Sequence, residues 1–238
     1  MQTKDIDYAA DGAILRGFLA LNESAGRVPG VLVFHEGLGL GDFAMEKARQ
    51  LASLGYVALA ADMFGERRQA KNLQEVSTIV AGLRAEPERL LARAHAALAT
   101  LAGLQQVDAS RLAAIGFCFG GSVVLELARS GADLKAAVSF HGVLATKQPA
   151  SEGQVKASIL VLTGAEDPLA PPGQVAAFEA EMRAAKVADW QVVSYGNTLH
   201  GFTNPAADGS MMRTALYHEQ SDRRSWAAMQ AFLGETLA

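Results

Sequence analysis

One hexapeptide constrains the fold of this chain more than any other segment. Residues 116–121 read Gly-Phe-Cys-Phe-Gly-Gly and contain the only cysteine of the sequence. An apolar run typical of a buried strand precedes it, and an apolar helical pattern follows it. Glycines on both sides of Cys118 permit a sharp strand-to-helix turn that lifts the central side chain out of the sheet. The start of the helix favours a thiolate there. We interpret Cys118 as a nucleophile; the alternative is a small buried side chain.

The composition fits a single folded domain over residues 1–238. Half of the residues are hydrophobic, and no linker-like segment divides the chain. The net charge of −4 is spread along the sequence, which excludes the basic face typical of nucleic-acid binding. A lone cysteine forms no intramolecular disulfide and fits a reducing compartment. Neither a signal peptide nor a membrane span is visible, so a cytoplasmic location is expected.

Apolar strand-like segments alternate with amphipathic helical ones along the chain. Asp11-Gly12 predicts a hairpin turn, Asp42 is expected to cap a helix, and Gly55 is expected to end it. Strands are predicted at 3–9, 13–21, 31–34, 56–61, 112–115, 136–140, 158–163 and 190–195, and helices at 44–54, 73–83, 87–103, 120–130, 172–186 and 222–237. This alternation predicts an α/β fold with a mainly parallel, twisted sheet and helices on both faces. Ligands of such sheets bind at the carboxyl ends of the strands.

Two residues downstream of the cysteine complete a candidate catalytic set. A thiol nucleophile needs a base, and the base needs an acid that orients it. Asp167 and His200 each follow a predicted strand, and they come after Cys118 in the order acid, then histidine, that accompanies this kind of turn. We predict a triad of Cys118, His200 and Asp167. Glu166 is the alternative acid, and the loop position favours Asp167.

The other four histidines carry weaker signals. His35 and His141 both end predicted strands and are expected to line the pocket or to support the site. His95 lies in a predicted helix, and His218 follows a long loop without a clear role. The histidines show no spacing typical of metal ligands and the cysteine is alone, so neither a metal site nor a cofactor is predicted.

A second informative string, His35-Glu36-Gly37, follows the third predicted strand, where one half of an oxyanion hole is expected. We predict the backbone amides of Gly37 and Phe119 as the two donors to the oxyanion. A carboxylate at the end of a buried strand is costly unless it is paired or protonated. Placed near Cys118, Glu36 would bind the thiol or accept its proton; the alternative is a glutamate in solvent or bracing a loop.

Together these residues resemble the dienelactone hydrolase family, over nearly the whole chain. The resemblance rests on residues 35–37, 116–121, Gly164 with Asp167, and 200–205. A cysteine in the turn combined with Glu36 separates this family from the serine esterases. The resemblance implies an α/β-hydrolase fold with a minimal cap, a Cys118–His200–Asp167 triad, and control of the protonation of the thiol by Glu36.

The resemblance also directs attention to the substrate. Family members that open dienelactone hold its carboxylate with arginines, one of them shortly after the catalytic histidine. Residues 201–205 contain no arginine here, which leaves Arg84 as a candidate or as a solvated helix residue. The segment between Phe140 and Ser158 is too short for a folded cap, so small water-soluble substrates are expected. The remaining predicted substrate contacts are His141, Phe64 and Phe202.

The predicted activity is hydrolysis of small carboxylic esters or lactones through a thioester intermediate. Promiscuous hydrolysis of phosphotriesters is a further hypothesis, because a phosphorylated thiol is less of a dead end than a phosphorylated serine. The alternatives are a ligand-binding protein on a hydrolase fold with little turnover and a single-cysteine thiol redox protein, which would need a partner thiol. The expected partner is the small-molecule substrate, without nucleic acid or membrane, for a monomer or homodimer.

Overall fold

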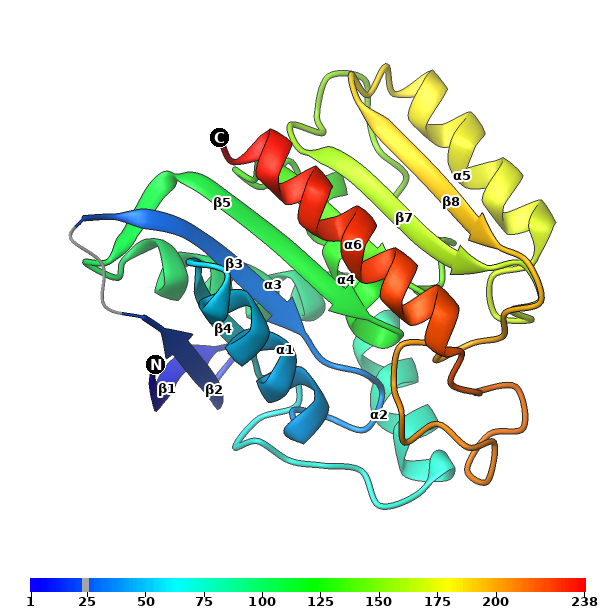
Figure 1. Ribbon diagram of the computed structural model, residues 1–238, viewed down its shortest axis with the longest axis horizontal. Helices are drawn as coiled ribbons and strands as arrows, with labels where there is room; N and C mark the ends of the chain where they lie inside the picture. Colours follow the sequence, from blue (N-terminus) through cyan, green and yellow to red (C-terminus); the bar gives the residue numbers. More distant parts are fainter. Residues whose placement is uncertain (23–25) are drawn as a thin grey trace. The chain divides into compact units, whose positions relative to one another are not determined.

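A computed structural model of the chain describes residues 1–22 and 26–238 (Figure 1). The chain forms two compact units, Met1–Ile115 and Gly116–Ala238, and the division falls inside strand β5 (Val107–Phe117). The single domain over residues 1–238 stays a prediction.

The strands confirm the predicted fold class. In sheet order they are β1 (Gln2–Ala10), β2 (Ala13–Leu21), β4 (Val57–Ala61), β3 (Val28–Phe34), β5, β6 (Ala136–Phe140), β7 (Ser158–Gly164) and β8 (Trp190–Tyr195). The pairs β3/β4, β6/β7 and β7/β8 are parallel, and the pairs β1/β2 and β2/β4 are antiparallel. Parallel strands of this kind are buried on both faces, which explains the continuous apolar runs in the sequence.

The first unit begins with the predicted hairpin. Strand β1 (Gln2–Ala10) pairs with β2 (Ala13–Leu21) across Asp11 and Gly12, whose φ angles of 47° and 78° are those of a tight hairpin turn. Strands β3 (Val28–Phe34) and β4 (Val57–Ala61) follow. The helices are α1 (Asp42–Ser53), α2 (Leu73–Ala85) and α3 (Pro87–Ala102). In Figure 1, α1 covers the near face of these strands and α3 the far face.

The ends of α1 show one expectation that holds and one that does not. Gly55 has a φ of 97° directly after the C-cap Leu54, and the amide of Tyr56 donates to the carbonyl oxygen of Leu51 at 3.2 Å. This is the glycine-terminated helix end that the sequence indicates. Asp42 as the N-cap is wrong: Gly41 occupies that position without a side-chain hydrogen bond, and Asp42 is the first helical residue. At this position its carboxylate still interacts favourably with the positive end of the helix dipole.

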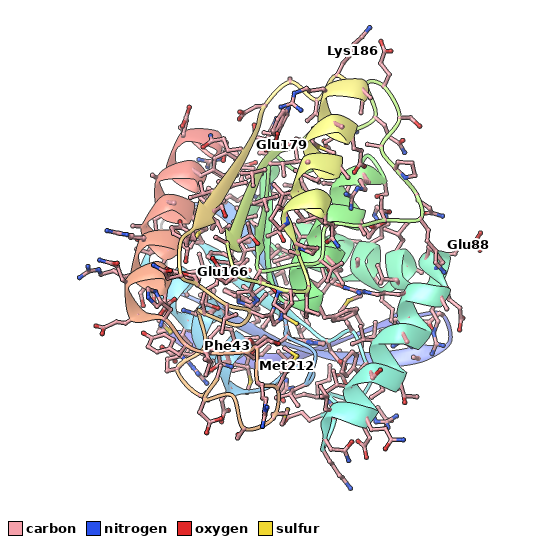
Figure 2. All side chains as sticks on the ribbon, turned by 90° about the vertical axis from the view of Figure 1, so that its right-hand side faces the viewer. Phe43, Glu88, Glu166, Glu179, Lys186 and Met212 are labelled. Atoms are coloured by element: carbon pink, nitrogen blue, oxygen red, sulfur yellow. The ribbon has the colours of Figure 1, made fainter. Side chains whose placement is uncertain are left out.

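The second unit continues with α4 (Phe119–Arg129), β6 (Ala136–Phe140), β7 (Ser158–Gly164), α5 (Pro172–Ala184), β8 (Trp190–Tyr195) and α6 (Glu219–Thr236). Figure 2 shows α6 on one side of its strands and α5, which carries Glu179, on the other. Large apolar side chains from both layers fill the space between them; those with at most 5% exposure include Phe140, Leu162, Phe178, Phe232 and Leu233. The amphipathic helices predicted from the sequence therefore cover both faces of these strands.

The segment between β6 and β7, all of it described, contains neither a helix nor a strand, as a minimal cap requires. Hydrogen bonds connect this segment to α4 and α5. Arg129 on α4 donates to the carbonyl oxygen of Leu144 at 2.9 Å, and Gln174 on α5 accepts from the amide of Leu144 at 2.6 Å. This segment is therefore a packed connection. Among residues 1–22 and 26–238, no helix combines the length and the apolar character needed to span a bilayer.

Candidate active site

Cys118 occupies the sharp turn that the sequence predicts. It lies between β5 and α4 with φ 54° and ψ −113°, a backbone conformation that residues other than glycine rarely adopt. Backbone strain of this kind is found at nucleophiles that a turn holds out of the sheet. A Cβ atom at Gly116 would collide with the carbonyl oxygen of Gly120, so the end of the strand approaches the first turn of the helix too closely for any other residue. The thiol is half-buried.

Three side chains of the second unit form a connected chain of hydrogen bonds. The Nε2 atom of His200 lies 3.1 Å from the sulfur of Cys118, and its Nδ1 atom lies 2.8 Å from Oδ2 of Asp167. Both His200 and Asp167 are only 2% exposed. The three residues come from the ends of β5, β7 and β8, which are far apart in the sequence. Parallel strands bring their carboxyl ends to one edge of the sheet, as expected.

The electrostatics of this chain favour a charged imidazole. Burial lowers the pKa of His200, and this effect is outweighed by the negative charge of the Cys118 sulfur and by the hydrogen bonds to Asp167 and Cys118. Together these raise the pKa of His200 from 6.5 to about 10. At neutral pH the imidazolium form therefore faces the sulfur, which suits a thiolate–imidazolium pair.

The choice between the two adjacent acids follows from their contacts. Asp167 is buried, and its second carboxylate oxygen accepts from the amide of Leu169 at 2.8 Å. Glu166 is exposed, and its backbone amide donates to Thr198 at 3.0 Å (Figure 2). The contact with His200 therefore belongs to Asp167 and not to its neighbour.

His141 and Phe202, two of the predicted substrate contacts, are fully buried. The ring of His141 meets those of His200 and Phe202 edge to face, with centroids 5.1 and 5.2 Å apart. Its Nδ1 atom accepts from the amide of Cys118 at 3.1 Å, and its Nε2 atom lies 2.8 Å from Oγ1 of Thr203. His141 therefore packs against His200, and Phe202 packs against His141.

The other predicted site residues, Glu36, Gly37, Phe64 and Arg84, belong to the first unit. Glu36, Phe64 and Arg84 are half-buried, and Gly37 is buried. Next to them, Nδ1 of His35 lies 2.6 Å from the carbonyl oxygen of Glu36, and Nε2 of His35 accepts from the amide of Met63 at 3.2 Å. His35 therefore supports the ends of β3 and β4, which is one of the two roles expected for it.

Asp62, directly after β4, is a buried residue that sequence reasoning did not single out. Its carboxylate accepts from four backbone amides, at distances of 2.7–3.1 Å. The donors are Arg16, Phe64, Gly65 and Arg67. Asp62 thus fixes the loop that carries Phe64. The only signal in the sequence is an aspartate followed by a glycine three residues later, a common turn pattern.

Within the described residues, no group of three or more histidine, cysteine, aspartate or glutamate side chains is arranged to hold a metal ion. The side chains of Cys118, His200 and Asp167 bring a thiol, an imidazole and a carboxylate into one hydrogen-bonded set.

A family model decides the relationship of the chain to known proteins: the model of the dienelactone hydrolase family matches residues 15–237. The chain belongs to the dienelactone hydrolase family. Like other members it is a hydrolase with the α/β fold.

Individual dienelactone hydrolase relatives agree with this assignment. The chain is 43% identical to a solved structure named m3DLH, with a TM-score of 0.94, covering 100% of this chain and 99% of that one. It is 40% identical to a dienelactone hydrolase-like promiscuous phosphotriesterase from metagenomic libraries, with a TM-score of 0.93 and coverage of 100% and 99%. Among curated proteins, it is 29% identical to a "Putative carboxymethylenebutenolidase" of Salmonella typhimurium, covering 93% of this chain and 88% of the relative.

Proposed function

We propose that this enzyme hydrolyses small carboxylic esters and lactones with Cys118 as the nucleophile, His200 as the general base and acid, and Asp167 as the orienting acid. One observation carries the proposal: His200 contacts the sulfur of Cys118 through Nε2 at 3.1 Å and the carboxylate of Asp167 through Nδ1 at 2.8 Å. This is the geometry that nucleophilic catalysis by a thiol requires.

The reaction has two covalent stages. The thiolate of Cys118 attacks the carbonyl carbon and forms a tetrahedral oxyanion, which collapses to a thioester when His200 gives its proton to the leaving alkoxide. A water molecule, deprotonated by His200, then attacks the thioester and releases the acid and the thiolate. In a lactone, the alcohol and the acid leave as one molecule. Asp167 keeps the Nδ1 proton of His200 in place throughout.

The oxyanion needs donors, and the amide of Phe119 is suited to that role. It is the first amide of α4, directly after Cys118, where the positive end of the helix dipole favours an oxyanion. Gly37 as the second donor and Glu36 as the group that controls the thiol proton stay predictions from the sequence. Glu36→Gln tests the latter, because it keeps the size of the side chain and removes its ability to accept a proton.

The test of the triad measures turnover and the intermediate together. Wild type, Cys118→Ala and His200→Ala are assayed with p-nitrophenyl acetate and with an unsaturated five-membered lactone. We expect both variants to lose turnover, by about 10³-fold or more. Acid quench followed by mass spectrometry should find the acyl group on the peptide of Cys118 in the wild type. Wild-type turnover in Cys118→Ala would refute the assignment.

We also propose hydrolysis of neutral phosphotriesters at the same sulfur. The observation that favours it is the 40% identity, over the whole chain, to a protein described as a promiscuous phosphotriesterase. The thiolate would displace the aryloxide from phosphorus, and water would cleave the resulting S–P bond. An aryl diethyl phosphate tests this proposal: release of more than one equivalent of phenolate per enzyme supports it, and release that survives Cys118→Ala contradicts it.

A further inference from the structure

The ring of His141 connects the backbone of the nucleophile to the loop that carries the base. Its Nδ1 atom accepts a hydrogen bond from the amide of Cys118 at 3.1 Å. Because a backbone amide only donates, Nδ1 carries no proton, and in the neutral ring the proton resides on Nε2. Nε2 then donates to Oγ1 of Thr203, 2.8 Å away and three residues after His200.

This connection runs beside the catalytic contact. On one side, the sulfur of Cys118 meets Nε2 of His200 at 3.1 Å. On the other, the amide of Cys118, the ring of His141 and the hydroxyl of Thr203 form a second link between the same two segments. The two imidazoles touch edge to face, with an interplanar angle of 72°. Two connections therefore fix the distance between Cys118 and His200: the direct contact between sulfur and imidazole, and the link through the ring of His141.

The construction of His141 itself is unusual. It directly follows β6, with a φ of 40°, and no part of it is exposed. A residue other than glycine adopts such a φ only at an energetic cost, so surrounding contacts must maintain it. Those contacts are the ones just described, together with the backbone hydrogen bond from His141 to Leu162 at 2.8 Å.

We propose that His141 is a positioning residue that holds the sulfur of Cys118 at reacting distance from His200. The proposal rests on the proposed triad and assigns His141 a role other than the substrate contact expected from the sequence. Its physical basis is that Cys118 occupies a strained turn, whose amide is held by His141 and by the carbonyl oxygen of Phe140 at 3.0 Å. A displacement of about 1 Å in a reacting group is enough to lower the rate by about 100-fold.

Two substitutions of His141 separate the effect of its hydrogen bonds from the effect of its volume. In His141→Asn the side-chain oxygen takes the place of Nδ1 as acceptor, and asparagine tolerates a positive φ. In His141→Leu the volume is roughly kept and both hydrogen bonds are lost. We expect kcat for p-nitrophenyl acetate to fall about 100-fold in His141→Leu and to stay within about tenfold of wild type in His141→Asn, with KM changed by less than about threefold in both.

The matched control is His95→Leu, the same substitution on the exposed side of α3, which should keep the wild-type kcat. Equal losses in the Asn and Leu variants, or wild-type kcat in the Leu variant, would overturn the proposal. A loss carried by KM instead of kcat would identify a substrate contact and would overturn it as well.

A second pair decides the question if His141→Leu does not fold. Thr203→Val removes the acceptor of the Nε2 proton and keeps the shape of the side chain, whereas Thr203→Ser keeps the hydroxyl. We expect kcat to fall by about tenfold or more in the Val variant and to be restored in the Ser variant. Wild-type kcat in Thr203→Val would overturn the proposal. Activity that survives Cys118→Ala refutes the proposed function; Cys118-dependent activity with unchanged His141 and Thr203 variants refutes the positioning role alone.

Discussion

The Nδ1 atom of His200 lies 2.8 Å from one carboxylate oxygen of Asp167, and the amide of Leu169 donates to the other at 2.8 Å. The two donors leave little freedom to an asparagine at this position. In Asp167→Asn the side-chain oxygen must face the Leu169 amide, which turns the NH₂ group toward His200. The Nδ1 atom then has to accept, so the Nε2 proton points at the sulfur of Cys118, in the wrong tautomer for a base.

For Asp167→Asn we expect kcat toward an alkyl ester to fall by about 10²–10⁴-fold, with a much smaller change in KM. Steady-state kinetics on the purified variant measure both. Asp133→Asn is the matched control, because Asp133 is exposed and its nearest ion-pair partner, Lys156, is 3.9 Å away. A kcat of Asp167→Asn within about threefold of wild type would rule out an orienting role for this carboxylate.

The raised pKa of His200 has a cause that one substitution removes. Burial lowers this pKa, and the negative charge of the Cys118 sulfur is the largest effect that raises it, to about 10. In Cys118→Ala burial is opposed by Asp167 alone, so the pKa of His200 should fall markedly. The imidazolium form, present at neutral pH in the wild type, should then lose its proton at a lower pH.

NMR titration of the His200 ring protons in the wild type and in Cys118→Ala measures the shift. His218, which caps α6 through Nδ1, serves as the internal reference for the same samples. A His200 pKa that is the same in the two proteins would show that the sulfur carries no negative charge beside it.

Local signals account for what the sequence could predict. The bounds of β6 and β8, 136–140 and 190–195, agree with the prediction, since both are short apolar segments bounded by turns. The hairpin at Asp11-Gly12 follows from the need for two residues with positive φ. The order of Cys118, Asp167 and His200 places three polar residues after three strands, and parallel pairing brings them to one edge.

The rest depends on contacts between distant segments. Strand β5 begins at Val107, well before the predicted start at residue 112. The prediction was too short because the first half of this strand is polar, and only its pairing with neighbouring strands makes it a strand. The link from His141 to Cys118 and Thr203 joins residues 23 and 62 positions apart, and no periodicity in the sequence encodes it. Asp42 failed as a cap for a simpler reason: a glycine beside it can occupy the same position.

Two glutamates on α5 should differ widely in their contribution to stability. Glu181 is 13% exposed and binds Arg129, which is 3% exposed, through two hydrogen bonds of 2.8 and 2.9 Å. It also accepts from the amide of Ala150 at 2.9 Å and so ties down the segment between β6 and β7. Glu179, two residues earlier, pairs with Arg183 at 3.0 Å, and Arg183 is 62% exposed (Figure 2).

We expect Glu181→Gln to lower the free energy of unfolding by about 2 kcal/mol, because it removes one of the two carboxylates that compensate the buried guanidinium of Arg129, the other being Glu126 at 3.0 Å. Glu179→Gln should change it by less than about 0.5 kcal/mol, as is typical of an exposed ion pair. Urea unfolding of the two variants and the wild type gives the comparison. Equal effects of the two substitutions would mean that the burial of Arg129 does not matter.

The turn at Cys118 predicts a strong asymmetry between two glycines. A methyl group at Gly116 would collide with the carbonyl group of Gly120, which is backbone and cannot rotate away. A methyl group at Gly234, on the exposed side of α6, has nothing within 4 Å. The same one-methyl substitution therefore meets a rigid obstacle at the first position and open solvent at the second.

We expect Gly116→Ala to lower the free energy of unfolding by at least about 3 kcal/mol, or to prevent folding, because β5 and the first turn of α4 must move apart. Gly234→Ala should raise it by up to about 1 kcal/mol, since alanine is the better helix former. Guanidinium unfolding with an unchanged slope separates these effects from changes in the unfolded state. If Gly116→Ala unfolded within about 1 kcal/mol of the wild type, the strand and helix at Cys118 would have room to relax, and the strained turn would not fix the position of the sulfur.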